Sequence, residues 1–576
     1  MNRNSINEVV DSLKIETAPI TDPQLQKVFT GLFNLVEVLA SENEKLTVEN
    51  QLLKNEINEL KGEQGKPNVK PNNRNKKDIS SEQERKDDKP EPKGEDDKDS
   101  SAQNPKKKKR NRKPKLLNIK IDREKKCEID KSILPPDAIN KGPTITVIQD
   151  IKIVTDNVRY CRETYYSPSL GKTFIAPLPK GVAGKGEFGV GVRSLIPLFK
   201  SECHLPESAI LTFFRNFGIQ TSATYISEQW TTGYGHFNQE KEDIVTAGIS
   251  SSTYQQIDDT GARVNGNNHY THVLCNPYYS AFFTTERKDR LTVLDIFRNF
   301  APREFLYNDY AIELLNGFNL PQKYRKLIDK NFDKNKVINK DDFDRLLVPI
   351  KLGPLQQRRM KEACAIAAYR TQTAIPVIGS LICDDAPQFK LLTETLGLCW
   401  VHDGRHYKKL NPVLTINKLI LDGFLTQYWA FYRKLKVYKA SPTPADMDVL
   451  YKEFNGLFTT RTDYEQLNER IAKTLAKRSE LLACLKQPEL PLHNNASELA
   501  ARVQARARDV SLHTKSEKGT KIKDSLMTIS QTAKKLGVST YKYILDRVSC
   551  EFRLPSLAEL VLQKSQSDNA AYLCSS

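Results

Sequence analysis

The chain has 576 residues, 39% of them hydrophobic and 28% charged, which allows several folded domains with large buried cores. Its net charge of +17 favours a polyanionic partner such as nucleic acid. No apolar run is long enough to cross a bilayer and no signal peptide is evident, so the sequence predicts a cytoplasmic protein without a membrane partner. Ten cysteines without a CxxC pair are typical of a reducing compartment.

A heptad repeat marks the first segment, residues 1–62. Leucine stands at every seventh position, at Leu25, Leu32, Leu39, Leu46, Leu53 and Leu60. The positions four residues after the first five leucines are Phe29, Val36, Asn43, Asn50 and Ile57. This pattern predicts a leucine-zipper coiled coil that forms a homodimer or a higher oligomer, and the two asparagines favour a parallel dimer. An amphipathic helix packed on the chain's own globular domain remains the alternative.

Large apolar residues nearly vanish from residues 63–115, which predicts a disordered charged linker. The linker ends in a basic block that comprises Lys106, Lys107, Lys108, Lys109, Arg110, Arg112 and Lys113. These side chains could neutralise DNA phosphates without reading sequence. A solvated charge run with no specific ligand explains the block equally well.

Two small regions follow the linker. Alternating apolar residues, such as those at 144–154, predict a small β-containing region over residues 116–180. Residues 181–245 have the outline of a helix-turn-helix: two helices, a turn at Gly218, and a third helix that is capped by Ser222 and runs to about Trp230. Ordinary helix packing would produce the same outline.

Acidic pairs follow two strand candidates. Residues 253–257 read as a strand that ends in a turn at Asp258 and Asp259, and further strands at 269–275 and 280–285 would complete an antiparallel meander. The apolar run at 375–383 predicts a buried strand that ends at Asp384 and Asp385.

A third acid, Glu498, opens a helical stretch in which Arg502 stands one turn later. Phosphodiester cleavage with two Mg²⁺ ions about 4 Å apart requires hard oxygen ligands on rigid supports. Three carboxylates from two strands and a helix could provide them, although sequence spacing alone does not show that Asp258, Asp384 and Glu498 converge.

Five motifs in order resemble the transposases of the Insertion Sequence 66 family. They are Gly218-Ile219 with Ser222 and Thr224, Asp258-Asp259-Thr260, Asp384-Asp385, Cys399-Trp400-Val401-His402 with Arg405, and Asn494-Asn495 with Glu498 and Arg502. The resemblance implies a multidomain α+β and α/β protein. Its catalytic domain, residues 246–548, would have an RNase H-like mixed sheet. Residues from about 295 to 370 and from about 411 to 487 look helical and are interpreted as insertions in this domain, and residues 549–576 as a C-terminal tail.

The resemblance also implies a function. Asp258, Asp384 and Glu498 would be the catalytic residues and would bind two Mg²⁺ or Mn²⁺ ions. Motif alignment selects Asp258 and Asp384, while Asp259 and Asp385 remain the alternatives within each adjacent pair. The enzyme would cleave DNA at terminal inverted repeats and join the freed 3′-hydroxyl to target DNA, in a bacterial, nucleoid-associated setting and with possible accessory proteins from the same element. Ser222, Thr224, Arg502 and the basic block would contact double-stranded DNA, while His402 and Arg405 would lie beside the acids.

The sequence departs from the family pattern at four points, one of which is the long helical stretch at about 411–487. Cys161 has no CxxC partner, so the zinc ribbon of many members would survive only as a remnant and no zinc is expected. The interval between Asp258 and Asp384 is long, and Leu499 replaces the usual arginine after the catalytic glutamate. Two alternatives therefore remain: a repurposed or inactive transposase that acts as a dimeric DNA-binding protein, and a coiled-coil scaffold with a nucleic-acid-binding tail.

Overall fold

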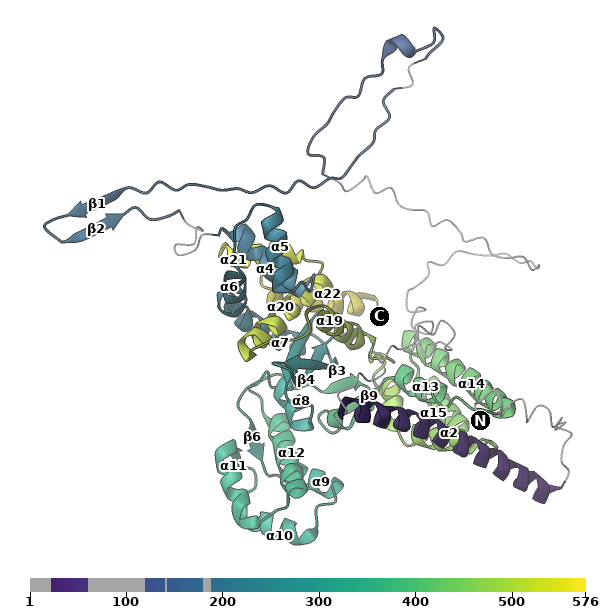
Figure 1. Ribbon diagram of the computed structural model, residues 1–576. Coiled ribbons are helices and arrows are strands. Elements are labelled where there is room, and N and C mark those ends of the chain that lie inside the picture. Colours follow the sequence, from purple (N-terminus) through teal and green to yellow (C-terminus); the bar gives the residue numbers. More distant parts are fainter. Residues whose placement is uncertain (1–21, 61–119, 140–141, 180–187, 576) are drawn as a thin grey trace.

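The computed structural model describes residues 22–60, 120–139, 142–179 and 188–575 (Figure 1). The predicted linker at 63–115 and its basic block lie outside these residues. Among the helices of the described part of the chain, none combines the length and apolarity needed to cross a membrane.

A five-stranded mixed sheet forms the centre of the molecule (Figure 1). Its strands are β3 (Tyr254–Val264), β4 (Asn267–Cys275), β5 (Ser280–Thr285), β8 (Ser380–Cys383) and β9 (Thr395–Leu398). They lie in the order β5-β4-β3-β8-β9, in which β3, β4 and β5 are antiparallel whereas β8 and β9 run parallel to β3. The predicted meander is therefore present, but the strand predicted at 375–383 begins only at Ser380.

Helices cover both faces of the sheet, because its strands alternate apolar side chains between them. On one face Val273 and Phe282 pack against α19 (Asn495–Ser511) and α20 (Glu517–Leu536). On the other face Leu274 and Phe283 join the main core, which also includes side chains of α7 (His236–Ser250) and α8 (Arg290–Phe297).

The N-terminal helix α2 (Pro23–Leu60) packs against its own chain through one side. Glu37 is 3% exposed, and its carboxylate accepts hydrogen bonds from the backbone N–H groups of Val413 and Leu414 at 2.8–3.0 Å. These groups precede α14 (Thr415–Ala440), so the carboxylate caps that helix from outside. Helix packing on its own domain was the alternative to a coiled coil, and the structure shows this contact.

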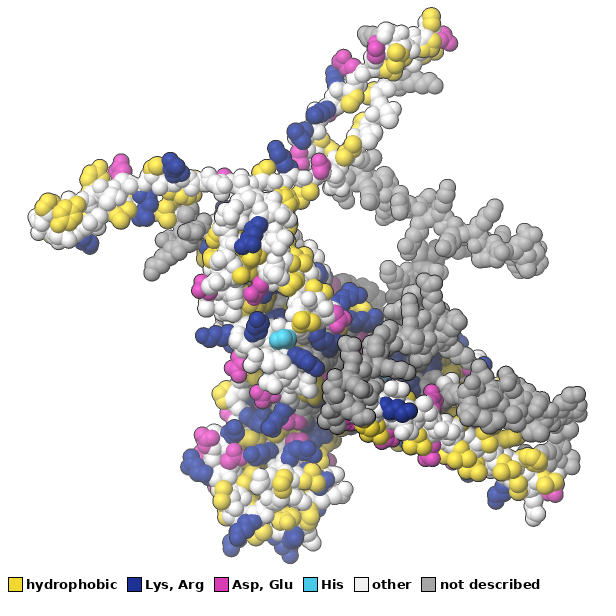
Figure 2. All heavy atoms as spheres, in the orientation of Figure 1, with side chains coloured by type: hydrophobic (Ala, Val, Ile, Leu, Met, Phe, Trp, Pro, Cys, Tyr) yellow, Lys and Arg dark blue, Asp and Glu magenta, His cyan; other side chains and the backbone are white. Residues whose placement is uncertain are grey.

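The heptad leucines lie on a different side of α2. Leu25, Leu32, Leu39, Leu46 and Leu53 are each 50–55% exposed. Figure 2 shows apolar side chains gathered along this helix. The leucine stripe therefore remains open for a partner, while Glu37 fixes the other side of the helix to the chain.

The region predicted to contain β-strands, residues 116–180, does contain a hairpin, but not at the expected position. The structure places no strand at 144–154, where Ile145, Ile148 and Ile151 are 78–83% exposed. A strand needs hydrogen-bonding partners, and this segment runs alone. The region contains a short 3₁₀ turn and one hairpin that projects away from the folded part (Figure 1). These elements are η2 (Lys131–Ile133), β1 (Thr164–Ser167) and β2 (Lys172–Ile175).

The three helices of the predicted helix-turn-helix are present. They are α4 (Val190–Ser201), α5 (Glu207–Asn216) and α6 (Ala223–Glu228), and the last continues as the π-helical turn η3 (Gln229–Gly233). Gly218 has a φ of +77°, and the Ser222 side chain accepts a hydrogen bond from the Tyr225 N–H at 3.1 Å, as the turn and the cap require. Helix α4 packs against α20 and α21 (Thr540–Val548), so this region shares one core with the rest of the chain.

The insertion predicted at 295–370 is mainly helical, as expected, but it also contains a two-stranded sheet of β6 (Glu304–Leu306) and β7 (Val337–Asn339). Its helical elements are α9 (Asp309–Gly317), α10 (Gln322–Asn331), α11 (Lys340–Leu347), η4 (Val348–Ile350) and α12 (Pro354–Thr371). The short turn η5 (Pro387–Phe389) lies between β8 and β9.

The insertion predicted at 411–487 is entirely helical apart from its loops. Besides α14 it contains α15 (Pro444–Phe458), α16 (Glu465–Leu475), α17 (Arg478–Leu481) and α18 (Ala483–Lys486). Trp400, at the start of α13 (Trp400–Lys408), is fully buried, and its ring packs against Tyr428 of α14 and Phe454 of α15. This contact joins the insertion to the end of the sheet.

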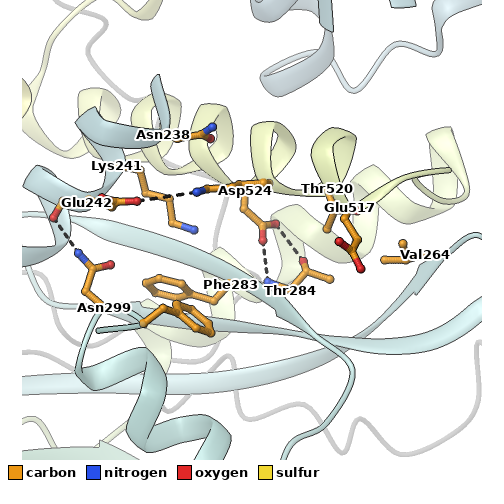
Figure 3. A pocket seen from close by; sticks show the side chains of 12 residues that line it. Asn238, Lys241, Glu242, Val264, Phe283, Thr284, Asn299, Glu517, Thr520 and Asp524 are labelled. Carbon is orange, nitrogen blue, oxygen red and sulfur yellow. Dashed lines mark hydrogen bonds and ion pairs between the residues drawn. The ribbon is translucent and has the colours of Figure 1, made fainter. Parts of the chain in front are cut away.

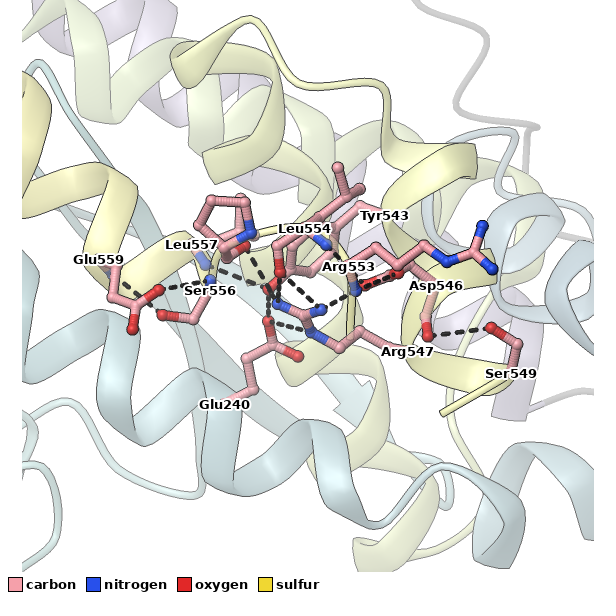
Figure 4. Close-up of polar contacts among 11 residues, drawn as sticks. Glu240, Tyr543, Asp546, Arg547, Ser549, Arg553, Leu554, Ser556, Leu557 and Glu559 are labelled. Carbon is pink, nitrogen blue, oxygen red and sulfur yellow. Dashed lines mark hydrogen bonds and ion pairs between the residues drawn. The ribbon is translucent and has the colours of Figure 1, made fainter. Parts of the chain in front are cut away.

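The expected C-terminal tail at 549–576 is wrong, because this segment contains the helix α22 (Leu557–Ser575), which packs against α7 and α20. Leu557 and Val561 are fully buried in the main core. Figure 4 shows the polar centre of this layer, where Arg547 contacts Glu240 of α7, Tyr543 and Asp546 of α21, and the backbone before α22.

Candidate active site

The parallel pairing of β3 and β8 places two of the predicted acids at one point of the sheet. The paired residues end at Gln256 and Ile382, and Asp258 and Asp384 each stand two positions further along the chain, Asp258 within β3 and Asp384 just after β8 ends. Because the register is in step, both side chains leave the sheet at the same level. The electrostatic influence of Asp384 on Asp258 agrees with this proximity.

Asp258 and Asp259 point to opposite faces of the sheet, as neighbours in a strand must. Asp258 pairs with Val273, whose face is covered by α19. Asp259 pairs with His272, and its carboxylate accepts hydrogen bonds from Gln388 at 2.8 Å and from Lys288 at 3.4 Å. The expected turn at these acids is wrong, since β3 continues to Val264; the acids lie where its parallel partner ends.

A similar division separates Asp384 from Asp385. Asp385 forms ion pairs with Lys390, at 2.9 Å, and with Lys477. Burial would raise the pKa of Asp385, but these two ammonium groups hold it below its ordinary value. Asp384 accepts a hydrogen bond from the Ala386 N–H at 3.1 Å. Asp385 therefore has two ammonium partners, whereas Asp384 has acidic neighbours, since it raises the pKa of Asp258 and is itself repelled by Asp259 and Asp385.

The third acid, Glu498, lies on α19, and the start of this helix is hydrogen-bonded to the sheet. The Asn494 side-chain amide donates to the Ile257 carbonyl at 2.8 Å, and its oxygen accepts a hydrogen bond from Ser497 at 2.5 Å. Glu498 stands in the first turn of the helix and is 8% exposed. Asn494 thus positions the helix that carries Glu498 directly beside the residue before Asp258.

The electrostatics indicate that Asp258 lies near both Asp384 and Glu498. Burial, followed by the repulsion of Asp384 and Glu498, raises the pKa of Asp258 to about 7. Burial also raises the pKa of Asp384. Like charges held together in a partly desolvated site disfavour ionisation, and a divalent cation would relieve this repulsion. A set of carboxylate oxygens is what Mg²⁺ prefers, so the residues present fit that ion.

His402 and Arg405 lie beside Glu498, where the sequence predicted them. The His402 Nε2 is 3.6 Å from the Glu498 Oε1, and an Arg405 guanidinium nitrogen is 3.4 Å from the Oε2. Both residues come from α13, so this helix holds the Glu498 side chain from one side.

Cys399 also lies beside the acids, although the sequence predicted no role for it beyond its place in the family motif. It is 1% exposed, and its sulfur accepts a hydrogen bond from the Asn494 N–H at 3.3 Å. The ligand atoms of Cys399, His402 and Glu498 all lie within 4.8 Å of one another. The CxxH spacing was the available signal, but only the fold brings Glu498 to it.

The residues predicted to contact DNA differ in their exposure and in their other contacts. Arg502 is exposed on α19, one turn beyond Glu498, and Thr224 is exposed on α6. The hydroxyl of Ser222 serves as the helix cap described above. Lys106 to Lys113 lie outside the described residues.

A cavity of about 320 Å³ lies away from the acids, at the β5 edge of the sheet (Figure 3). Lys241, Phe283 and Asp524 are among its lining residues, and Asp524 accepts hydrogen bonds from Thr284 at 2.6 and 2.9 Å. Burial lowers the pKa of Lys241 to about 8. None of the three candidate acids lines this cavity, so it is separate from the candidate active site.

Comparison with known proteins gives two matches. Residues 355–522 match the family described as "Transposase IS66 family". The protein named "Uncharacterized protein y4jO" from Sinorhizobium fredii (strain NBRC 101917 / NGR234) is 29% identical over 326 residues, which are 56% of this chain and 100% of that protein. The resemblance predicted from the sequence motifs is therefore confirmed for residues 355–522. This segment includes Asp384 and Glu498 and begins after Asp258.

Proposed function

We propose, from the premise that residues 355–522 are a transposase domain of the IS66 family, that this chain cuts and joins DNA with Asp258, Asp384 and Glu498. The observation that carries the proposal is the proximity of Asp258 on β3 to Asp384, just after β8, and to Glu498 on α19, since burial and then repulsion from these two acids raise the pKa of Asp258. Such a mutual repulsion is costly in a purely structural site, and it is expected where cations bind.

The sheet supports an RNase H-like catalytic fold. In its order, β5-β4-β3-β8-β9, three antiparallel strands are followed by two parallel ones, and the first acid lies on the strand where the two halves meet. Glu498 comes from a helix on one face. This arrangement agrees with the fold that the family resemblance implies.

Asp258, Asp384 and Glu498 would hold two Mg²⁺ or Mn²⁺ ions. When bound, such ions activate a nucleophile and stabilise the leaving oxygen of a phosphodiester. The chain's own residues prepare the site: Asn494 orients the helix of Glu498 against β3, while His402 and Arg405 restrict the Glu498 carboxylate. Rigid support of this kind reduces the reorganisation needed when substrate arrives.

DNA would approach along the basic side of this site. Arg502 and Arg506 are exposed on α19 in successive turns after Glu498, so they can contact phosphates next to the scissile bond. Ser222 and Thr224 of the helix-turn-helix and the basic block at 106–113 would contact further double-stranded DNA, such as terminal inverted repeats. These contacts, the target DNA and possible accessory proteins of the element remain part of the proposal.

A second copy of the chain would pair through the leucine stripe of α2. The stripe is half-exposed and is separate from the side of α2 that Glu37 fixes. We expect the double variant Leu32→Lys, Leu46→Lys to be monomeric by light scattering, because two charges would enter the apolar seam. Val48→Lys is the matched control, since Val48 is 58% exposed and lies outside the seam. A dimer that survives the double change would contradict this proposal.

The function is tested by Mg²⁺-dependent cleavage of labelled DNA that contains the inverted repeats flanking the gene. Asp258→Asn, Asp384→Asn and Glu498→Gln should each reduce cleavage by at least about 10³-fold, as expected for a lost charge-stabilising group. Asp259→Asn and Asp385→Asn are the matched controls, and they should retain most activity because their carboxylates contact lysines instead. Equal activity of Asp258→Asn and wild type would refute the assignment.

A dimeric DNA-binding protein without cleavage is the second candidate, and Leu499 is the observation that favours it. Leu499 is 51% exposed, however, so its side chain points away from the buried acids. Wild-type protein that binds the repeats in Mg²⁺ but does not cleave them would support this second function.

A further inference from the structure

The side chains of Cys399, His402 and Glu498 form a mixed sulfur, nitrogen and oxygen group beside the candidate acids. Their ligand atoms lie within 4.8 Å of one another, and the His402 Nε2 is 3.6 Å from the Glu498 Oε1. Three ligands of one tetrahedral Zn²⁺ ion lie roughly 3.4–3.6 Å apart, given bond lengths of about 2.0–2.3 Å. The group therefore needs to contract by only about 1 Å to bind a single ion.

The backbone around this group is already fixed. The Cys399 N–H donates to the Cys383 carbonyl at 3.0 Å, and the Trp400 N–H donates to the Leu492 carbonyl at 3.0 Å. The Asn494 N–H donates to the Cys399 sulfur at 3.3 Å. These contacts hold the start of α13 against both β8 and the segment before α19, so two of the three ligands are presented from a rigid junction.

The donor atoms select a different metal from the one expected at the acids. Mg²⁺ takes oxygen ligands and rarely binds thiolate, whereas sulfur with imidazole favours Zn²⁺ and Co²⁺. Three protein ligands leave one tetrahedral position for water. Arg405 contacts the Oε2 of Glu498 and His402 lies beside the Oε1, so the Oε1 is the oxygen that would bind such an ion together with His402.

We propose that Cys399, His402 and Glu498 bind Zn²⁺, or a similar thiophilic divalent ion, at a site that shares Glu498 with the Mg²⁺-binding acids. One carboxylate cannot fully serve both sites, so Zn²⁺ withdraws Glu498 from the acid group and inhibits DNA cleavage. Binding itself requires only the three side chains. The inhibition rests on the proposed function, because it requires that Glu498 serve the reaction.

Binding is tested on the full chain with Co²⁺ as the probe, since a cysteine-bound tetrahedral Co²⁺ ion absorbs through sulfur-to-metal charge transfer. Wild type should show this band, and Zn²⁺ should abolish it. Loss of an outer-sphere partner already costs about 10–100-fold in metal affinity, so Cys399→Ser should weaken Co²⁺ binding at least as much. Cys484→Ser is the matched control, because Cys484 is also buried but lies outside the group.

A second variant, His402→Gln, keeps the proposal testable if Cys399→Ser does not fold. His402 is partly exposed, with 25% of its side chain accessible, so His402→Gln should fold and still lose affinity. Absence of the charge-transfer band in folded wild type, or an unchanged band in folded Cys399→Ser, would overturn the proposal. If Cys399→Ser fails to fold, an unchanged band in His402→Gln does the same.

The inhibition is measured separately, with Zn²⁺ added to Mg²⁺-dependent cleavage. Wild type should be inhibited at Zn²⁺ concentrations at least about tenfold lower than Cys399→Ser requires, in line with the affinity loss. Equal inhibition of both proteins would refute competition for Glu498. If wild type does not cleave DNA at all, the proposed function fails, while the Co²⁺ band still decides whether the metal site exists.

Discussion

Two clusters of buried charge in this chain differ in how they are balanced. In the first cluster, the Arg547 guanidinium forms ion pairs with the carboxylates of Asp546 and Glu240 (Figure 4). It also donates hydrogen bonds to the carbonyls of Leu554 and Pro555 at 3.1 Å. In the acid cluster, Asp258 meets the like charges of Asp384 and Glu498. The first arrangement is stable as it stands, whereas the second needs a cation.

The sign of the neighbouring charges distinguishes a structural acid from a candidate metal ligand more clearly than burial does. Burial raises the pKa of both Glu240 and Asp258 to about 7. For Glu240 the largest charge effect is that of Arg547, which opposes the rise more than Asp243 or Asp546 adds to it, while for Asp258 the largest charge effect is repulsion from Asp384. A buried acid whose neighbours repel it is a candidate ligand for metal, and one whose neighbour attracts it is a candidate structural contact.

The largest expected effect comes from breaking the balanced cluster. Arg547→Met should lower the free energy of unfolding by about 3–5 kcal/mol, because it leaves Asp546 and Glu240 buried without their cation. Arg553→Met is the matched control: the Arg553 side chain is 77% exposed and its pair with Glu551 should contribute less than about 1 kcal/mol. Urea unfolding measures both, and equal losses would show that the Arg547 cluster is not a structural centre.

A smaller effect of opposite sign is expected in the acid cluster. The raised pKa means that the metal-free folded state binds a proton at Asp258 more tightly than the unfolded chain does. The stability that this proton contributes is complete below the unfolded pKa and is lost as pH rises through about 7. Asp258→Asn avoids that loss. It should stabilise the metal-free protein by about 1–3 kcal/mol at pH 8 and by almost nothing near pH 4. The gain at pH 8 is smaller than the roughly 4 kcal/mol that corresponds to the whole rise in the pKa of Asp258.

Asp385→Asn is the control with the reverse sign. The pKa of Asp385 is lowered by Lys477 and Lys390, so its contribution is present at neutral pH and is lost as pH falls through the lowered value. This variant should destabilise the protein at pH 8. Thermal unfolding at pH 4, 6 and 8 measures both variants. If Asp258→Asn destabilises the protein at pH 8, the mutual repulsion that distinguishes the two clusters is absent.

The sequence predicted the elements that carry local signals. The three antiparallel strands, the helix of Glu498 and the Ser222 cap all follow from short-range patterns that the structure confirms. It could not supply the strand register, and the register decides that Asp258 and Asp384 leave the sheet at the same level. The assignment of these acids to catalysis remains a prediction.

Two wrong predictions, at residues 144–154 and at Leu419, share one cause: an apolar pattern does not show which other part of the chain will pair with it or cover it. Residues 144–154 alternate like a strand, but no neighbouring strand pairs with them. The apolar residues Leu419, Phe424, Trp429 and Leu435 of α14 predict one buried face of the helix, yet Leu419 is 68% exposed while the other three are buried. The same limit applies to α2, where one helix combines a side fixed by Glu37 with a leucine stripe that remains open.

The smallest expected effect tests whether the acid cluster is completed by metal. Mg²⁺ at about ten times its dissociation constant should raise the unfolding free energy of wild type by about 1.4 kcal/mol, since it binds only the folded state. Asp258→Asn should lose this increment, because it removes one of the charges that bind the ion. Arg547→Met should keep it despite its lower stability, because its cluster does not contact the acids. Thermal unfolding with and without Mg²⁺ distinguishes these outcomes, and an equal gain in Asp258→Asn would mean that the ion stabilises the chain elsewhere.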